Sequence, residues 1–298
     1  MSEAVLSVES SGRFAMGRWR VHRMGFGAMQ LAGDGVFGPP RDRAEALAVL
    51  RQAVSDGVDH IDTAQYYGPD VVNELIRDAL HPYPSGLAIV SKVGARRDES
   101  GGVFPYDEPH QLREGIEDNL RTLGTGRLAA VNLRLLDDSR PDKRFEDQLG
   151  AMVQARDEDL IDGVGLSNIT REHPLAALSI TDIVCVQNMF NLADRRSLPL
   201  LESCRDRGIA FVPFFPLGSA RAGRDRVLRD PRVAAVAARY RASSAQVALA
   251  WLLGLAPNVL LIPGTRSRTH LAENLGAGGV ALSSDAMDEL TALAVNGT

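Results

Sequence analysis

The sequence is poor in cysteine, with only Cys185 and Cys204 among its 298 residues. Both lie in apolar or helical surroundings and lack CxxC spacing. We interpret them as packing residues of a reducing compartment, not as a disulfide or a metal site. No cluster of histidine, cysteine and carboxylate residues has the spacing of metal ligands, so no metal is expected.

Basic residues are also in the minority. Lysine and arginine number 33 against 38 acidic residues, which gives a net charge of −5. A chain with this balance is not expected to bind nucleic acid over a broad face, and any recognition of phosphate must be local. The expected partner is a small-molecule carbonyl substrate, and the chain is expected to be a monomer or a small homo-oligomer.

Long hydrophobic runs are missing as well. No uncharged apolar run approaches the ~20 residues of a membrane span. The N-terminal segment Met1–Val5 is acidic and lacks the basic start and apolar stretch of a signal peptide. The sequence therefore predicts a cytoplasmic protein without a membrane partner.

Short apolar runs alternate with longer amphipathic ones along the whole chain. This alternation predicts one (β/α)8 barrel, a fold of about 250 residues, as a single domain over residues 1–298. A doubly wound open sheet is disfavoured because no GxGxxG motif follows the first strand. The segment Phe14–Val21 is expected to form a β-hairpin that closes the bottom of the barrel. The predicted strands are Met24–Ala28, His60–Ala64, Ala88–Lys92, Ala130–Arg134, Gly163–Ser167, Ile183–Gln187, Ala210–Phe215 and Val259–Pro263.

Several helix ends are marked by capping residues. Asp42 is expected to cap a helix that ends at Gly57, and Gly124 is expected to stop another. Ser243 or Ser244 is expected to begin a helix rich in apolar residues. These signals agree with helices placed between the predicted strands.

Ionisable side chains mark the ends of three predicted strands. Asp62, Lys92 and Arg134 each end a strand, and Tyr67 lies in the loop just after one. In a (β/α)8 barrel, reactive groups come from the C-terminal ends of strands. These four side chains are therefore predicted to meet at one mouth of the barrel.

Tyr67 is the expected proton donor of this group. A tyrosine has an unperturbed pKa near 10, too high for efficient acid–base work at neutral pH, but a nearby ammonium lowers it. Lys92 can supply that charge, and Asp62 can hold Lys92 in place. Taken singly, each residue also has a structural explanation, as a cap, a solvated lysine or a packing tyrosine. Their joint pattern on consecutive strands favours chemistry.

The segment Asp62-Thr63-Ala64-x-x-Tyr67-Gly68, followed by Ser91-Lys92, resembles the aldo-keto reductases. The resemblance covers nearly the whole chain, and the shared order and spacing of the motifs make it specific. It implies a (β/α)8 barrel that binds NADPH without a Rossmann fold and reduces an aldehyde or ketone to the alcohol. Further segments similar to the family are Gly25–Met29, Gly163–Asn168, Val186–Asn191, Pro213–Gly218, and Ile262–Thr265 with Leu271–Asn274.

The chain departs from the family at one catalytic position, where most members carry a histidine. A gap-free reading from Leu123-Gly124-Thr125 places Arg134 there, whereas a slip of one residue would place Leu135 there. The asparagine-leucine-arginine form of this strand is similar to a bacterial branch of the family that includes pyridoxal reductases.

The arginine changes the expected chemistry of that position. Arginine stays charged and only donates hydrogen bonds, whereas a neutral histidine can also exchange protons. We therefore expect Arg134 to lower the pKa of Tyr67 further and to leave proton supply to the Tyr67–Lys92 side. In the alternative, Arg134 points away and pairs with Asp137 or Asp138.

The resemblance also implies how the cofactor is held. Ser167, Asn168 and Gln187 would hydrogen-bond the nicotinamide carboxamide, Phe214 would stack on the ring, and Pro216–Ser219 would offer backbone groups to the pyrophosphate. The full set of implied cofactor-binding residues is Gly27, Ala28, Met29, Asp62, Ser167, Asn168, Gln187, Phe214, Phe215, Pro216, Leu217, Gly218, Ser219, Gly264, Thr265, Arg266, Ser267, His270, Glu273 and Asn274.

The segment Thr265–Arg268 opens the helix after the last strand. Helix N-termini favour anions, and arginine binds phosphate well, so this segment suits the 2′-phosphate of NADPH. His270 is placed to reach the same phosphate, and Glu273 and Asn274 match adenine contacts of the family. NADPH is therefore expected to be preferred over NADH. In the alternative, the arginines of this segment are surface charges.

The predicted substrate pocket is mostly apolar and aromatic. This mixture implies an apolar or aromatic carbonyl compound, with one polar or anionic group facing Arg134. The residues expected to form the pocket wall, all placed on loops at the mouth, are Met29, Tyr66, Phe104, Tyr106, Leu136 and Phe215.

Two other functions fit parts of the pattern. A Schiff-base lyase or aldolase would use Lys92, and borohydride would then trap substrate on that residue. A non-catalytic NADP-binding regulatory subunit would bind the cofactor tightly with negligible turnover. The retention of Asp62, Tyr67 and Lys92 together speaks against the regulatory subunit, and the leading interpretation is the reductase.

Overall fold

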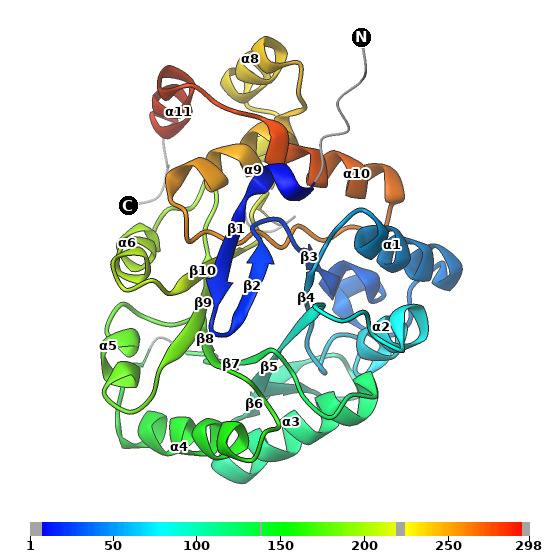
Figure 1. Ribbon diagram of the computed structural model, residues 1–298, viewed down its shortest axis with the longest axis vertical. Coiled ribbons are helices and arrows are strands. Elements are labelled where there is room, and N and C mark those ends of the chain that lie inside the picture. Colours follow the sequence, from blue (N-terminus) through cyan, green and yellow to red (C-terminus); the bar gives the residue numbers. More distant parts are fainter. Residues whose placement is uncertain (1–7, 138, 219–223, 294–298) are drawn as a thin grey trace.

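The computed structural model describes residues 8–137, 139–218 and 224–293. Parallel strands form a curved sheet in the hydrogen-bonded order β3-β4-β5-β7-β8-β9-β10, and helices surround it (Figure 1). Each strand of this sheet except β5 is followed directly by a helix or a helical segment, as expected for α/β alternation. The strands of this sheet are β3 (Phe26–Gly27), β4 (His60–Asp62), β5 (Ala88–Arg97), β7 (Ala130–Arg134), β8 (Val164–Ser167), β9 (Ile183–Met189) and β10 (Ala210–Phe214).

An extended segment, not a regular eighth strand, closes the ring. Val259 forms a parallel bridge with Phe211 of β10, and Leu261 forms another with Met24, just before β3. The predicted (β/α)8 barrel is therefore confirmed, although its first and last strands are shorter than the sequence predicted. The closing segments approach closely, because a Cβ at Gly264 would lie 2.3 Å from the carbonyl oxygen of Gly27.

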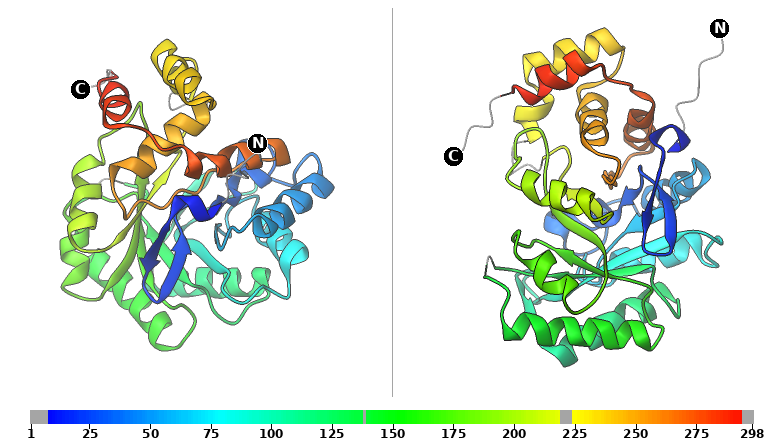
Figure 2. Two further views of the ribbon diagram at one scale, coloured as in Figure 1. Left: turned by 45° about the horizontal axis from the view of Figure 1, so that its top comes forward. Right: turned by 60° about the vertical axis from the view of Figure 1, so that its left-hand side comes forward.

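The helices cover the outer face of the barrel (Figure 2). Within the described parts of the chain, none is long and apolar enough to cross a lipid bilayer. Helix α8 and helix α11 pack beyond α9, outside the ring. The helices are α1 (Arg43–Ser55), α2 (Val71–Leu80), α3 (Pro109–Leu123), α4 (Lys143–Asp157), α5 (His173–Leu178), α6 (Leu198–Asp206), α7 (Arg224–Leu228), α8 (Pro231–Tyr240), α9 (Ser244–Leu255), α10 (Arg268–Gly276) and α11 (Ser284–Thr291).

The predicted helix caps are confirmed. The Asp42 side chain accepts a hydrogen bond from the backbone N–H of Glu45 at the start of α1. Gly124 ends α3 in the left-handed conformation, with φ 66°. Of the two candidates for the start of α9, Ser243 is the cap, because its hydroxyl accepts from the Gln246 N–H.

A hairpin closes the N-terminal end of the barrel, as predicted. Strands β1 (Arg13–Met16) and β2 (Trp19–His22) pair antiparallel. Met16 and Val21 pack in one apolar cluster with Val90 and Val212 of the barrel strands. The hairpin therefore shields the interior of the barrel from water at the end opposite the strand C-termini.

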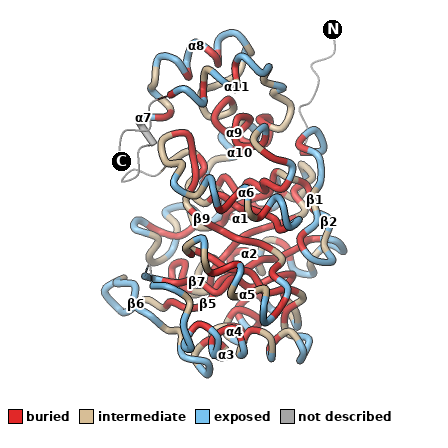
Figure 3. The backbone as a smooth tube through the Cα atoms, turned by 90° about the vertical axis from the view of Figure 1, so that its left-hand side faces the viewer, coloured by how far each residue is buried: buried red, intermediate tan, exposed pale blue. Residues whose placement is uncertain are grey.

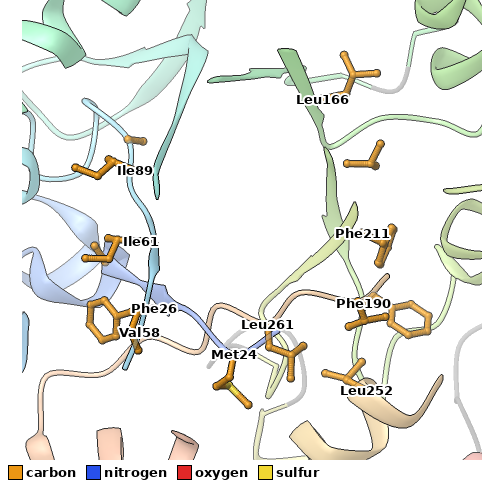
Figure 4. Close-up of a cluster of buried hydrophobic side chains, with 14 of the residues drawn as sticks. Met24, Phe26, Val58, Ile61, Ile89, Leu166, Phe190, Phe211, Leu252 and Leu261 are labelled. Atoms are coloured by element: carbon orange, nitrogen blue, oxygen red, sulfur yellow. The ribbon is translucent and has the colours of Figure 1, made fainter. Parts of the chain in front are cut away.

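The main hydrophobic core lies between the strands and the helices. Figure 4 shows Ile61, Ile89 and Leu166 on the outer side of their strands. Side chains alternate between the two faces of a strand, so the residue after Ile61, Asp62, points to the barrel interior. This alternation is the local reason why a charged group can lie inside the barrel while its neighbours fill the core.

Strand β5 runs beyond its predicted end at Lys92 and forms a second hairpin with β6 (Val103–Tyr106). The Arg96 guanidinium stacks on the Tyr106 ring at 3.9 Å. Phe104 is exposed on this hairpin, which lies at the edge of the molecule (Figure 3). The prediction that Phe104 and Tyr106 lie on a loop is therefore wrong, since both belong to β6. Leu136, also predicted in the pocket wall, is exposed.

Candidate active site

A buried ion pair lies at the C-terminal ends of β4 and β5. The Lys92 Nζ atom lies 2.5 Å from Oδ1 of Asp62 and donates a second hydrogen bond, of 3.0 Å, to the carbonyl oxygen of Thr63. The two charged side chains are only 4% and 5% exposed. The structure thus brings the predicted aspartate and lysine into direct contact, and we refer to them below as the buried ion pair.

Tyr67 lies beside the buried ion pair. The Lys92 Nζ atom is 5.2 Å from the centroid of the Tyr67 ring, and the Tyr66 ring meets the same ring edge-on at 5.3 Å. Gly68 follows with φ 82°, and a Cβ there would lie 2.9 Å from that of Val71, so the turn after Tyr67 requires glycine. The predicted triad of aspartate, tyrosine and lysine is therefore assembled in one place.

The expected lowering of the tyrosine pKa is wrong in direction. Burial raises the pKa of Tyr67 above its ordinary value, and the Asp62 carboxylate raises it further. Arg134 and Arg97 oppose this rise without cancelling it. The free-energy cost of removing the phenolate from water exceeds the stabilisation that the neighbouring cations give it. Tyr67 therefore holds its proton at neutral pH, which the predicted role of proton donor requires.

The raised pKa of Tyr67 predicts how the turnover number depends on pH. Carbonyl reduction needs the protonated phenol, which persists below the pKa of Tyr67, so kcat for reduction should stay high up to pH 10 or so, the ordinary tyrosine pKa. Alcohol oxidation needs the phenolate and should rise as the pH increases. Steady-state kinetics in both directions across the pH range would check this. A midpoint between pH 6 and 8 in reduction would contradict it.

Arg134 reaches across the mouth of the barrel. It ends β7, yet its guanidinium carbon lies 5.7 Å from the centroid of the Phe214 ring at the end of β10, with β8 and β9 between them. Asp137 instead accepts hydrogen bonds from Ser139. The alternative in which Arg134 pairs with Asp137 is therefore not what the structure shows, and Asp138 lies outside the described residues.

Sequence reasoning missed a second cation at the mouth, Arg97. Its Nε atom donates to the Tyr66 carbonyl oxygen at 3.0 Å, and its Nη1 atom donates to the Gly101 carbonyl oxygen at 2.5 Å. Its charge also acts on Tyr67, where it opposes the rise in pKa that burial causes. Arg97 went unnoticed because the predicted strand stopped at Lys92, five positions too early.

A buried polar network supports the ion pair from the outer side of the strands. The Thr63 hydroxyl donates to Oδ1 of Asn73 at 2.8 Å, and Nδ2 of Asn73 donates to Oδ1 of Asn119 at 3.0 Å. The Ser91 hydroxyl donates to the same Asn119 oxygen at 2.5 Å. Thr63 and Ser91 flank the buried ion pair in sequence, so α2 and α3 clamp both strand ends through this network.

We expect Asn119→Ala to lower kcat severalfold and to destabilise the fold by roughly 1–3 kcal/mol, since buried partners lose their hydrogen bonds. Asn258→Ala is the matched control, because Asn258 is also buried but bonds Ile209 at the other end of the barrel. The control should lose similar stability and keep its kcat. Urea unfolding and steady-state kinetics measure the two effects. Equal kcat in both variants would show that the network does not position the ion pair.

The residues predicted to bind the nicotinamide leave two buried polar atoms without partners. Ser167 and Gln187 are adjacent across β8 and β9. Nε2 of Gln187 donates to Oδ2 of Asp62 at 2.5 Å, whereas Oε1 of Gln187 and the Ser167 hydroxyl have no partner among the described residues. Buried polar groups are normally paired. A carboxamide offers both N–H donors and a carbonyl acceptor, so NADPH fits this position.

The other predicted nicotinamide contacts are only partly available. Nδ2 of Asn168 already donates to the Leu135 carbonyl oxygen at 2.8 Å. Phe214 is half-buried, with the Arg134 guanidinium near its ring. The next predicted residues, Phe215, Pro216, Leu217 and Gly218, follow β10 at the same mouth, and Ser219 lies outside the described residues.

The predicted phosphate-binding arginines pair with acids at the surface. Arg266 lies 3.5 Å from Asp34. Arg268 lies 3.2 Å from Oε2 of Glu45, and its backbone N–H donates to Oε1 of the same carboxylate. The Glu45 carboxylate therefore occupies the anion position at the N-terminus of α10. This contact shows that the start of the helix accepts an anion. A phosphate bound at this position would have to displace the Glu45 carboxylate.

The remaining predicted cofactor residues follow the two closing segments of the ring. Ala28 is buried and Met29 is half-buried, just after β3. Thr265 and Asn274 are buried, His270 is exposed, and Glu273 is half-buried on α10. Ser267 caps α10 by accepting from the His270 N–H.

Comparison with known proteins decides the family. Residues 23–295 match the model of the aldo/keto reductase family. The chain belongs to this family. The resemblance stated from the motifs is thereby confirmed, and so is the reaction class, carbonyl reduction with NADPH by an oxidoreductase.

Individual relatives agree with this membership. Pyridoxine 4-dehydrogenase of Escherichia coli is 46% identical over 284 residues, which cover 94% of this chain and 98% of the relative. An uncharacterized oxidoreductase of Schizosaccharomyces pombe is 36% identical over 97% of this chain and 92% of its own length.

Solved structures confirm the fold. A thermostable aldo-keto reductase in complex with the inhibitor epalrestat superposes with a TM-score of 0.79 at 29% identity, over 95% of this chain and 99% of that one. An aldo/keto reductase from Klebsiella pneumoniae in complex with NADP and acetate gives 0.78 at 25% identity, over 94% of each chain.

Proposed function

We propose that this aldo-keto reductase reduces a pyridoxal-like aromatic aldehyde to its alcohol with NADPH. The observation that carries the proposal is the buried Asp62–Lys92 pair beside Tyr67, next to the unpaired polar atoms of Ser167 and Gln187. Similarity to pyridoxine 4-dehydrogenase over nearly the whole chain supports the substrate class.

Each residue has a definite task in this reaction. When bound, the reduced nicotinamide supplies a hydride to the carbonyl carbon. Tyr67 donates its proton to the carbonyl oxygen, and Lys92 holds positive charge beside the phenol as that proton leaves. Asp62 accepts hydrogen bonds from both Lys92 and the amide of Gln187. One carboxylate therefore orients the lysine beside the proton donor and the glutamine predicted to bind the nicotinamide.

The structure argues against the Schiff-base alternative. A Schiff base forms from a neutral, accessible amine. The Lys92 ammonium instead lies in an ion pair, donates to the Thr63 carbonyl and is 4% exposed. We therefore expect borohydride to trap no substrate on Lys92.

The decrease in NADPH absorbance across a panel of carbonyl compounds that includes pyridoxal tests the proposal. Turnover of aromatic aldehydes, lost in Tyr67→Phe, is the expected result. Tight NADP binding with no turnover of any compound would overturn it in favour of a regulatory subunit. Trapping on Lys92 would overturn it in favour of a lyase.

Two substitutions near the predicted phosphate site are expected to change the affinity for NADPH in opposite directions. Arg268→Ala should weaken NADPH binding by about tenfold, because a charge-assisted phosphate contact is lost, and should leave NADH binding nearly unchanged. Glu45→Gln should strengthen NADPH binding, because the competing carboxylate is removed from the helix N-terminus. Dissociation constants from fluorescence titration measure both. Unchanged NADPH affinity in both variants would place the phosphate elsewhere.

We also propose that the enzyme acts in the cytoplasm as a monomer or a small homo-oligomer. Both cysteines are free and buried, which suits a reducing compartment. Cell fractionation tests the location. Light scattering coupled to size-exclusion chromatography tests the assembly state.

A further inference from the structure

The mouth of the barrel holds a charged side chain that has no counter-ion among the described residues. Arg134 is half-buried and reaches across to Phe214, 5.7 Å from the ring centroid. Among the residues that the structure describes, its guanidinium forms no ion pair. The neighbouring cations differ: Lys92 is paired with Asp62, and Arg97 is bound to backbone carbonyls. Arg134 therefore has its hydrogen-bonding capacity available for a ligand.

A second unsatisfied group lies nearby. The hydroxyl of Tyr66 is buried and has no hydrogen-bond partner in the described structure. The positive charges of Arg134 and Lys92 both act on it, although burial dominates and raises its pKa, so it remains a donor. The Tyr66 ring packs against that of Tyr67. The Arg134 guanidinium and the Tyr66 hydroxyl thus both lack a hydrogen-bond partner among the described residues, and the Tyr66 ring contacts that of Tyr67.

We propose that Arg134, assisted by Tyr66, recognises an ionised hydroxyl on the ring carbon next to the aldehyde. The substrate class is then that of ortho-hydroxy aromatic aldehydes, to which pyridoxal belongs. This inference rests on the proposed function and specifies which aromatic aldehydes the site selects. In such a compound the aldehyde oxygen and the phenolate oxygen can face the same edge, where the planar guanidinium can donate to both.

Charge balance explains why an arginine suits this position better than a neutral histidine. Hydride addition places negative charge on the aldehyde oxygen until Tyr67 donates its proton. With an ionised hydroxyl beside it, two adjacent oxygens carry negative charge at that moment. A neutral imidazole offers one donor and no charge, whereas the guanidinium is a permanent cation with several donors. Arg134 thus offsets a repulsion that an ordinary aldehyde does not create.

The test compares matched aldehydes within each enzyme variant. The substrates are 2-hydroxybenzaldehyde, its 2-methoxy ether and 4-hydroxybenzaldehyde, assayed with saturating NADPH at a pH where the hydroxyls ionise. Wild-type kcat/KM should favour the 2-hydroxy compound over the methoxy ether by on the order of tenfold to a hundredfold, as expected for a charge-assisted bidentate contact. Arg134→Met should remove most of this ratio, whatever it does to the absolute rate.

Two further variants separate recognition from general damage. Arg97→Met removes a cation of the same mouth whose guanidinium is already engaged, so the 2-hydroxy to 2-methoxy ratio should be retained. Tyr66→Phe should lower the ratio in part. A direct readout is calorimetric binding of 4-deoxypyridoxine, which keeps the ring hydroxyl but cannot be reduced. Its affinity for the NADP complex should fall at least about tenfold in Arg134→Met.

The possible results distinguish this inference from the proposed function. Reduction of all three aldehydes at similar kcat/KM in the wild type would overturn the ortho preference and leave the reductase intact. A preference that survives in Arg134→Met would overturn the role of Arg134. No reduction of any aldehyde would overturn the proposed function itself.

Discussion

Replacing Tyr67 with phenylalanine should lower kcat for carbonyl reduction by roughly 10²–10⁴, the usual contribution of a positioned general acid. In the proposed reaction the phenol beside Lys92 gives its proton to the carbonyl oxygen. Cofactor binding should not change, because the variant keeps the ring and loses only the hydroxyl. Stopped-flow measurement of the hydride-transfer step, together with cofactor titration, separates the two properties.

Tyr83→Phe is the matched control for this variant. Tyr83 is a partly buried tyrosine whose pKa, like that of Tyr67, is raised by burial, but its hydroxyl donates to the Leu123 carbonyl oxygen, away from the mouth. We expect the control to keep its kcat. Turnover by Tyr67→Phe within threefold or so of the wild type would mean that another group or water supplies the proton.

Lys92→Met should damage both stability and activity. Removing one partner of a buried ion pair leaves the Asp62 carboxylate buried and uncompensated, which typically costs about 3–5 kcal/mol. Urea unfolding measures this loss, and the steady-state rate should fall with it because Tyr67 loses the neighbouring charge. The surface pair Arg239–Glu289 provides the contrast, since Arg239→Met should leave unfolding near that of the wild type.

A double variant tests why Lys92→Met should lose stability. In Asp62→Asn with Lys92→Met both charges of the pair are absent, so much of the stability lost in Lys92→Met should return. Activity should not return, because neither the charge beside Tyr67 nor the anchor for Gln187 is restored. If the double variant is as unstable as the single one, packing and not charge is the cause.

Local patterns in the chain predicted much of the fold. Apolar runs of strand length, capping residues such as Asp42 and Ser243, and the hairpin over 14–21 all depend on neighbours in sequence. The sequence pattern did not predict strand pairing between segments that are distant in the chain. The two closing segments of the ring are too short to be told from loops, and the β5–β6 hairpin depends on contacts that extend a strand past its apolar run.

The candidate site, too, was predictable from the sequence only in part. Strand ends and loop spacing placed Asp62, Tyr67 and Lys92 at one mouth, because parallel strands end at the same edge. Spacing did not show that Asn73 and Asn119 clamp the strands, since those residues approach only when α2 and α3 pack. It also did not show that Glu45 bonds the start of α10.

The sequence by itself determined the barrel and the family, and it predicted the acid, its lysine and its aspartate, because these depend on residue type and order along the chain. Tertiary structure alone decided the direction of the Tyr67 pKa and the orientation of Arg134. Both are properties of surroundings that distant segments build. The free energy of a charge depends on how much water and which counter-ions remain around it, and residue order does not specify either one.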